Sequence, residues 1–522
     1  MLTRRQLVRR GAAGAAVLLL PPATARAAVL RSGRFRQGVL SGDPTPTGIT
    51  LATILDEAEG RGSVRLEVAR DAAFRRVVAS RNITTSGADG HSVKARIKGL
   101  DPHERYFYRF ETRTTQSPVG RFQTALPEDS NETVKFAFFS CADYTHGYYN
   151  AYELMAREDI DFVVNLGDYI YAEAYHSRKS GTGVRDDKIG EAKTLADYRD
   201  KYALYRSDKA LRDVHAKFPM IATWDDHEVV DNYAGNAPGG GLDASKGYSN
   251  ARKNAGYKAY FEAMPFFPSG RSRIYRGLRF GKTVDMVMLD QRQYRDDQPC
   301  GDAVAAPCAD YDAPRAYLGR TQLDWVKQRL ATSPAAWKVI GNEAMMMNAE
   351  LPGGNYYGFD SWQGYSNERE ELLEHLRARA IKDVVFVTGD IHTFIAGDVR
   401  TQRNRGESVA LEFVGGSITS QSFGETNLPI GGGQTLPGND ANPNTAPAII
   451  DTLRGLNPWV DQADFDHHGY GLVEANASKF DVTLKRVQTI KKRSRATLPT
   501  AGFTYSVARG QTSIKGVNGP KG

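Results

Sequence analysis

The sequence predicts an α/β protein in which a layered α/β domain follows a small all-β sandwich. Residues 28–126 contain short alternating runs separated by turn signals, as in antiparallel sheets. From about residue 133, continuous apolar runs alternate with helical patterns, as in sheets that are covered on both faces. We expect an export signal at 1–27, the sandwich at 28–126, the α/β domain at 127–510 and a flexible tail at 511–522.

Composition excludes several classes of protein. The 522 residues are 41% hydrophobic and 25% charged, which is ordinary for a globular chain and excludes global disorder. The 51 glycines follow no three-residue period, and no apolar run approaches the roughly 20 residues of a membrane span. The net charge of +7 falls to +2 without the five arginines of residues 1–27, a segment that has no acid. We therefore expect no specific nucleic-acid partner.

Residues 1–27 are typical of an export signal. Arginines precede the apolar stretch Gly11–Leu20, which is too short to span a membrane, and Ala25-Arg26-Ala27 offers a cleavage site. Arg4-Arg5 followed by Gln6-Leu7 resembles a twin-arginine signal; an ordinary secretory signal is the alternative. We expect a secreted or cell-envelope protein that meets the twin-arginine translocase during export and has no stable membrane anchor.

Four strands are expected in residues 28–126: Ile49–Leu55, Val64–Ala69, Val93–Ile97 and Tyr106–Thr112. The turn Gly99–Pro102, placed before a tyrosine-rich strand, resembles that of fibronectin type III modules. Because this part carries no titratable cluster, we expect it to be structural.

The α/β domain is expected to contain strands on its apolar runs and helices between them. The strands are Val134–Phe139, Phe162–Leu166, Met220–Thr223, Val284–Leu289, Val339–Ile340 and Val384–Val387. The helices are Tyr149–Arg157, Leu195–Leu204, Arg320–Leu330 and Glu368–Ala380. The glycine-rich stretches Ala234–Gly247 and Phe423–Asn444 are expected to be long surface loops.

Reactive side chains follow four of these strands, at the carboxyl ends where α/β folds place their sites. In chain order they are Cys141; Asp168 and Tyr171; Asp225, Asp226 and His227; and Asp390 and His392. Adjacent acids repel one another unless cations offset them. Mixed carboxylate, imidazole, thiolate and phenolate donors fit iron or another transition metal, and surplus carboxylates suit calcium or magnesium. The pattern predicts a polynuclear metal site. His467 and His468 belong to a further polar cluster whose role stays open.

The three cysteines have different expected roles. Cys300 and Cys308 bracket a short loop, which in an oxidising compartment predicts a disulfide. Cys141 is left over, either as an inert buried thiol or as a metal ligand. A thiol hydrolase that uses Cys141 would leave the acids at the other strand ends unexplained.

Other catalytic motifs are weaker. Gly277–Thr283 mimics a P-loop, but it is one residue short between its glycines, and a strand rather than a helix is expected after it. The sequence contains no Gly-x-Ser-x-Gly nucleophile motif.

From about residue 35 to 505 the chain resembles the PhoD-like alkaline phosphatases, which are related to purple acid and calcineurin-like metallophosphoesterases. The motifs that carry the resemblance are Ser140-Cys141, Gly167–Tyr171, Trp224–Glu228 with Asn232, Leu289–Arg295, Trp362–Tyr365 and Thr388–His392. It implies a calcineurin-like metallophosphoesterase domain after the sandwich. It also implies a ferric ion (Fe³⁺) and one or two calcium ions (Ca²⁺).

The resemblance also implies a ligand set. Cys141, Asp168, Tyr171 and His392 would surround the iron, and Asp168 would bridge to calcium. Asp226 and Asp390 would lie on the calcium side, with Asp225 and Asn232 as further candidates for the second metal. Two positions depart from the family pattern: Glu173 lies one place late and is not assigned as a ligand, and Gln363 stands where an acid is expected.

These expectations lead to a hydrolase of phosphate esters. Metal-activated hydroxide would attack phosphorus in line, His227 would protonate the leaving group or bind phosphate, and Arg292 would bind phosphate bidentately. Alternatively, His227 would only orient a neighbouring acid, and Arg292 would form a surface salt bridge.

We favour a phosphodiesterase, similar to phospholipase D-like relatives, with phosphomonoesterase activity. Its substrate would be a phospholipid, a teichoic acid or a small phosphodiester. The alternatives are an alkaline phosphatase that scavenges phosphate and a non-catalytic envelope-binding protein. An oxidase is disfavoured because thiolate and phenolate donors hold iron in the ferric state.

Overall fold

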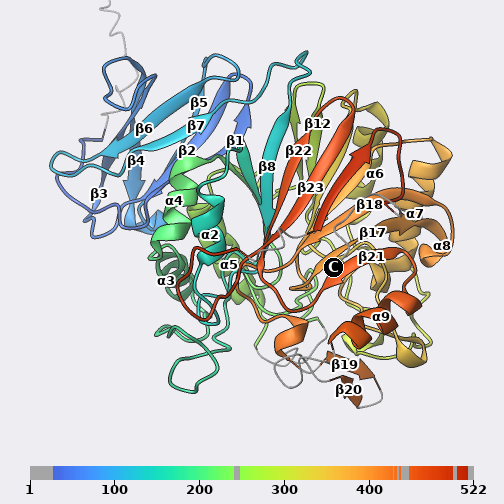
Figure 1. The fold of residues 1–522 in the computed structure, drawn as a ribbon. Helices are drawn as coiled ribbons and strands as arrows, with labels where there is room; N and C mark the ends of the chain where they lie inside the picture. The colour runs from blue at the N-terminus through green and yellow to red at the C-terminus, as the bar shows by residue number, and fades with distance from the viewer. Residues whose placement is uncertain are drawn as a thin grey trace, which may run out of the picture.

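The computed structural model describes residues 27–239, 247–426, 428–431, 434–436, 446–497 and 503–514. Two large β-sheets pack face to face, and helices cover the outer face of each (Figure 1). The predicted α/β class is confirmed. The predicted export signal lies outside the described residues, except for its last position.

The first sheet has nine strands in the order β24-β23-β22-β8-β9-β10-β1-β2-β5. Their bounds are Phe503–Ala508, Lys479–Arg486, Gly469–Ala475, Val134–Phe139, Phe162–Leu166, Met220–Thr223, Val39–Thr45, Gly48–Ile54 and Ser92–Lys98. Strands β8, β9 and β10 are parallel, so their carboxyl ends meet at one edge.

The second sheet has seven strands in the order β11-β12-β13-β16-β18-β17-β21. Their bounds are Arg276–Phe280, Val284–Met288, Trp337–Asn342, Val384–Thr388, Ser408–Gly415, Phe394–Arg400 and Val460–Asp464. Strands β12, β13, β16 and β18 are parallel. The P-loop mimic forms the hairpin β11–β12, which confirms that it is not a phosphate-binding loop.

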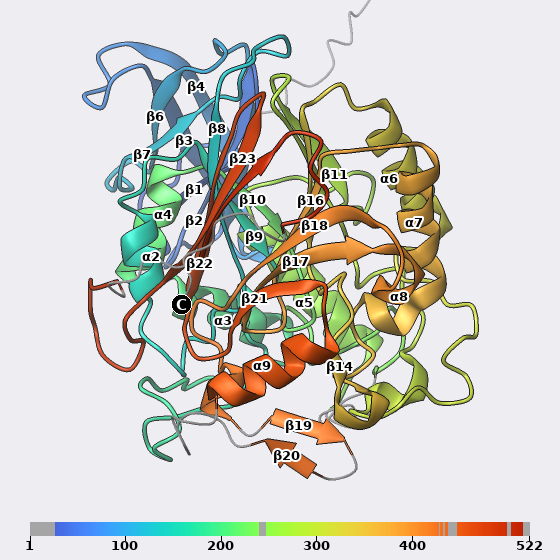
Figure 2. The same cartoon turned by 45° about the vertical axis from the view of Figure 1, so that its right-hand side comes forward.

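Helices lie on the outer side of each sheet (Figures 1 and 2). The first group, beside the first sheet, is α2 (Asn150–Met155), α3 (Leu195–Tyr205), α4 (Lys209–Lys217) and α5 (Asn250–Ala263). The second is α6 (Arg320–Thr332) and α7 (Ser366–Ala378), with the short α8 (Thr401–Asn404) nearby; α9 spans Ala446–Leu456 beside β21. Thr194 begins α3 through a capping box with Asp197.

The alternation of side chains explains why the two sheets pack together. On β8, Phe136 and Phe138 point into the core between the sheets, whereas Ala137 and Phe139 point toward the helices. Strand β16 alternates in the same way between the inter-sheet core and the core under α6 and α7. The continuous apolar runs therefore mark strands that are buried on both faces, as predicted.

The N-terminal sandwich has its own core but shares a sheet with the α/β domain. Its outer sheet is β4-β3-β6-β7, with bounds Val77–Ser86, Arg61–Ala69, Arg105–Glu111 and Gly120–Gln123. The inner strands β1, β2 and β5 extend the nine-stranded sheet, because Gly42 on β1 pairs with Met220 on β10. The four strands predicted in this part are confirmed.

Two sequence expectations need correction. The stretch Phe423–Asn444 was expected to be a loop, but it contains a 3-10 turn at Phe423–Glu425 and a hairpin of β19 (Leu428–Gly431) with β20 (Gln434–Leu436); its other residues lie outside the described part. The flexible tail was expected from residue 511, but Ile514 is buried and its N–H donates to Asp398 Oδ1. None of the helices in the described part of the chain is long and apolar enough to cross a membrane.

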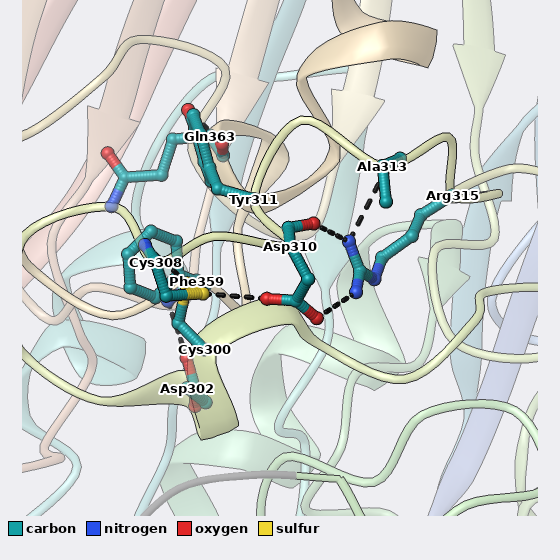
Figure 3. Close-up of a disulfide and its surroundings, with 9 residues drawn as sticks. All are labelled: Cys300, Asp302, Cys308, Asp310, Tyr311, Ala313, Arg315, Phe359 and Gln363. Carbon is teal, nitrogen blue, oxygen red and sulfur yellow. Dashed lines mark hydrogen bonds and ion pairs between the residues drawn. A yellow bond between two sulfur atoms is a disulfide. The ribbon is translucent and has the colours of Figure 1, made fainter.

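The loop between β12 and α6 carries the predicted disulfide (Figure 3). The sulfur atoms of Cys300 and Cys308 are 2.05 Å apart. Asp302 follows within this loop, and its Oδ1 accepts a hydrogen bond from the Phe359 backbone N–H at 2.5 Å. The disulfide loop therefore brings a carboxylate to the loop that contains Phe359.

The packing between the sheets gives a stability prediction. Phe162 is fully buried, and its ring lies 5.2 Å from that of Phe136 and 4.2 Å from that of Phe280. We expect Phe162→Ala to lower the free energy of unfolding by about 3–5 kcal/mol because it leaves a cavity. Urea unfolding followed by circular dichroism measures this. Val77→Ala, at an exposed position, should change stability by less than about 0.5 kcal/mol; equal effects would contradict the assigned packing.

Candidate metal centre

Most of the predicted site residues lie in or beside one cavity at the carboxyl ends of the parallel strands. The cavity has a volume of about 600 Å³ and is open to solvent. Asp168, Asp226, His227, Asn232, Asp390 and His392 are among the residues that line it. Cys141, Tyr171 and Asp225 are buried. Cys141 Sγ and the Tyr171 hydroxyl contact Asp168, whereas Asp225 contacts Arg292.

Left-handed backbone conformations aim these side chains. Cys141, Asp168, Asp390 and His392 have φ angles of 58°, 51°, 66° and 56°, which non-glycine residues rarely adopt. Each residue follows the end of a strand by two to four positions. The surrounding structure must stabilise this strain, and strained residues of this kind cluster at functional sites.

The first group of donors surrounds Asp168. The Cys141 Sγ atom lies 3.4 Å from Asp168 Oδ2, and the Tyr171 hydroxyl lies 3.3 Å from the same oxygen. The Tyr171 hydroxyl is also 3.1 Å from His392 Nε2. One donor atom each from Cys141, Asp168 and His392 falls within 4.8 Å of the others. The four predicted iron ligands are thus brought together.

Neighbouring groups hold these donors in place. His392 Nδ1–H donates to the Gln421 carbonyl at 2.9 Å, which leaves Nε2 directed at the centre. The Ser420 hydroxyl donates to the Tyr171 oxygen at 2.6 Å. Glu228 accepts the backbone N–H groups of Asp168, Tyr169 and Asp225, so it fixes two strand ends at once.

The second group of donors contains Asp168, Asp226 and His227, which also fall within 4.8 Å of one another. His227 Nδ1 lies 2.8 Å from Glu173 Oε2, so the ring presents Nε2 to Asp226 at 3.8 Å. The Asn232 N–H donates to Asp226 Oδ2 at 2.7 Å. Glu173 therefore orients His227, which agrees with leaving it out of the ligand set.

The charges at this site call for cations. Burial raises the pKa of the Asp168 and Asp390 carboxyls well above the usual range. Burial, followed by the charge of Asp168, also raises the pKa of the Cys141 thiol. Burial raises the pKa of Asp225 to about 6 despite its pairing with Arg292, and its Oδ2 atom has no hydrogen-bond partner within the described residues. This set of thiol, phenol, imidazole and crowded carboxylates fits transition-metal and hard-cation binding.

Arg292 occupies a different position from the one predicted. Its side chain is fully buried and is not among the described residues that line the cavity. Its Nε atom bonds Asp225, and its Nη1 and Nη2 atoms lie 3.0 and 2.7 Å from the oxygens of Asp360. With these bonds in place, Arg292 holds Asp225 and Asp360 and does not extend into the cavity. A sequence position after a strand does not distinguish these two roles.

The disulfide loop contributes to the wall of the cavity. Asp302 lines it, and its Oδ2 accepts a hydrogen bond from Asn232 Nδ2 at 2.8 Å. Burial, followed by the charge of Asp360, raises the pKa of Asp302 to about 7. Asp302 thus links the disulfide to a predicted second-metal residue.

Sequence reasoning missed several residues of the site. Ser420 and Gln421 follow β18, whose apolar run Val409–Val414 ends in two glycines. Applying the strand-end rule to that run would have found them. Asp302 and Asp360 lie in loops that do not follow a predicted strand, so the sequence could not predict that they reach the site. Of the two histidines left open, His467 pairs with Asp464 and His468 contacts Glu425.

The chain is similar to known phosphatases over most of its length. Residues 136–484 match the model of the PhoD-like phosphatase family, and residues 22–126 match that of its N-terminal domain. The chain is 38% identical over 414 residues to alkaline phosphatase D of Bacillus subtilis, covering 75% of this chain and 70% of the relative.

Comparison with solved structures also finds phosphatases. A structure of PhoD superposes with a TM-score of 0.81 at 32% identity, covering 94% of this chain and 92% of that one. A purple acid phosphatase from yellow lupin (Lupinus luteus) seeds superposes with a TM-score of 0.56 at 12% identity, covering 90% of this chain and 74% of that one, and shares the fold. The chain therefore belongs to the PhoD-like phosphatase family and is a phosphoric ester hydrolase, and its clustered donor groups are suited to hold metal ions.

Proposed function

We propose that this hydrolase is an exported phosphodiesterase, similar to phospholipase D-like enzymes, with a phosphomonoesterase side activity. Export is supported by the signal pattern of residues 1–27 and by the disulfide Cys300–Cys308, which is typical of oxidising compartments. The preference for diesters is supported by an apolar cavity next to the metal centre.

We assign the metals by the chemistry of the donors. Cys141, Asp168, Tyr171 and His392 would hold a ferric ion. Calcium would take Asp168, Asp226 and Asp390, with Asp225 and Asn232 as further candidates. When bound, these ions supply positive charge that attracts phosphate oxygens and makes water more acidic.

His227 is suited to protonate the leaving group. Burial alone would lower its pKa, but the charges of Asp226, Asp168 and Glu173 raise it well above the usual range. Glu173 holds Nδ1 and leaves Nε2 facing the cavity, so the ring can carry a proton there when these charges stabilise it. A protonated imidazole in this position can donate to a leaving alkoxide.

The apolar cavity is the observation that carries the diester proposal. It has a volume of about 50 Å³ and is lined mainly by apolar side chains, together with Asn348, Glu350, Arg454 and Asn457. Five residues line both this cavity and the metal cavity: Met345, Ala349, Tyr357, Ile391 and Phe423. A substrate that places its phosphate at the metals can therefore place an apolar substituent here. The apolar lining suits a short hydrocarbon stretch of a phospholipid better than a polar teichoic acid or a simple monoester.

Ligand assignment gives a prediction about metal content. Cys141→Ser should lose most of the iron and most of the activity, because the thiolate is replaced by a weak neutral donor. Elemental analysis of purified protein measures the iron. The control is the double variant Cys300→Ser/Cys308→Ser, which removes the other two cysteine sulfurs and should keep its iron. Wild-type iron content in Cys141→Ser would contradict the assignment.

The role of His227 gives a prediction about leaving groups. His227→Asn should lower the rate with alkyl leaving groups by about 10²–10⁴-fold. It should slow p-nitrophenyl esters much less, because p-nitrophenolate leaves without a proton. Turnover of a series of esters with leaving groups of graded pKa measures the difference. Equal losses across the series would show that His227 binds phosphate instead.

The diester proposal is tested with three substrates. We expect faster turnover of a diacyl phospholipid and of bis-p-nitrophenyl phosphate than of p-nitrophenyl phosphate. A faster monoester reaction would indicate a phosphate scavenger. No turnover of any of them, in protein that contains iron, would favour the non-catalytic binding protein.

A matched pair of variants in α9 tests the apolar cavity. Leu453 is buried and lines it, whereas Leu456 is exposed on the same helix. Leu453→Gln should reduce kcat/KM for the phospholipid by about tenfold, on the order of 1.4 kcal/mol of lost apolar contact, and should leave bis-p-nitrophenyl phosphate unaffected. Leu456→Gln should change neither. A loss with both substrates in Leu453→Gln would point to a folding defect rather than to lipid binding.

A further inference from the structure

A second cluster of metal-binding side chains lies outside the catalytic cavity. It consists of His146 after β8, Glu425 at the end of the 3-10 turn Phe423–Glu425, and His468 before β22. Glu425 Oε2 lies 2.9 Å from His146 Nε2 and 3.0 Å from His468 Nε2. The side chains are 3%, 11% and 5% exposed in the order His146, Glu425 and His468. None is among the described residues that line the catalytic cavity.

The hydrogen bonds of His468 leave the lone pair of its Nε2 atom facing the Glu425 carboxylate. The Ser417 hydroxyl donates to the Ser420 carbonyl at 2.7 Å. Ser417 Oγ therefore accepts from His468 Nδ1–H at 2.9 Å. In the neutral ring, Nε2 then carries no proton, and it points at an oxygen of Glu425. Two acceptors 3.0 Å apart need a proton or a cation between them.

His146 Nε2 also has neighbours that no single protonation state satisfies. Its Nε2 atom lies 2.9 Å from Glu425 Oε2 and 2.8 Å from Lys491 Nζ. A proton on Nε2 would face the ammonium group, and a lone pair would face the carboxylate. His146 Nδ1 is buried and has no hydrogen-bond partner within the described residues. Giving both histidines a proton would place two imidazolium ions and an ammonium around one carboxylate, which is costly in a buried site.

A divalent cation removes both conflicts, because two imidazole lone pairs and a carboxylate oxygen would then point at one positive charge. We propose that His146 Nε2, Glu425 Oε2 and His468 Nε2 bind a divalent transition-metal ion of the zinc class. Two imidazoles and a carboxylate are a donor set that zinc favours. The site is separate from the catalytic metals and does not depend on which ester the enzyme cleaves.

Lys491 marks the position that the ion would take over. Its Nζ atom contacts both His146 Nε2 and Glu425 Oε1 at 2.8 Å. Its side chain is 47% exposed, whereas the three donors are buried. The ammonium can therefore move into solvent when the metal binds, and it competes with the metal until then.

The position of the cluster indicates what the ion would do. Residues 417–425 carry Glu425, and Ser417 of the same segment holds His468. Between them, Ser420 bonds Tyr171 and Gln421 bonds His392 at the catalytic centre. An ion bound by Glu425 and His468 would fix both ends of this segment. It would thereby hold two of the predicted iron ligands in position without touching substrate.

The test measures zinc binding in the full mature chain. Protein is exposed to Zn²⁺, passed through a desalting column and analysed for zinc per chain. We expect one tightly bound zinc in wild type and in Cys141→Ser, which disturbs only the catalytic centre. We expect that zinc to be lost in His468→Gln and kept in His467→Gln, because the neighbouring His467 pairs with Asp464 instead.

A variant that should bind zinc more tightly is a second test, because misfolding can cause a loss of zinc but not a gain in affinity. Lys491→Met removes the competing ammonium and should tighten zinc binding by about tenfold or more, which is about 1.4 kcal/mol. Competition with a chromogenic chelator measures the affinity. Equal zinc content in wild type and His468→Gln, or no zinc in either wild type or Lys491→Met, would overturn the proposal. The cluster would then be an ion-paired group of protonated histidines.

Discussion

Mutual repulsion between buried carboxylates is the constraint on which the rest of this structure depends. Asp168, Asp225, Asp226, Asp360 and Asp390 converge where the parallel strands of two sheets end. Within the described residues, the cationic side chains bonded to this group are Arg292, Arg295 and His227, and burial still raises the pKa of Asp168 and Asp390. Bound metal ions would supply the missing positive charge and would allow so many acids to share one buried edge.

The two sheets provide the rigidity that holds these acids together. Their inner faces share one apolar core, and left-handed residues at the strand ends turn the chain so that side chains from separate strands meet. Residues outside the predicted set of metal ligands complete the arrangement. Glu228 joins two strand ends, Arg292 holds Asp225, and Glu173 orients His227. The proposed cation at Glu425 would add a further tie from outside the cavity.

The sequence predicted the parts of the site that local patterns encode. Strands β8, β9, β10 and β16 are continuous apolar runs, and each is followed within five residues by its reactive side chains. Long-range pairing was not readable. The alternating strand Lys479–Arg486 gave no hint that it would join the first sheet, and Ser420 meets Tyr171 across 249 positions of the chain. The inward turn of Arg292 depends on acids from other loops, so its sequence position alone favoured a surface or phosphate-binding role.

The central claim is that a ferric ion lies among Cys141, Asp168, Tyr171 and His392. Anomalous diffraction from crystals of the purified enzyme, recorded on both sides of the iron absorption edge, tests it most directly. We expect an iron-specific peak between the Cys141 sulfur and His392 Nε2. No such peak in crystals of active protein, or an iron peak only at another place, would contradict it.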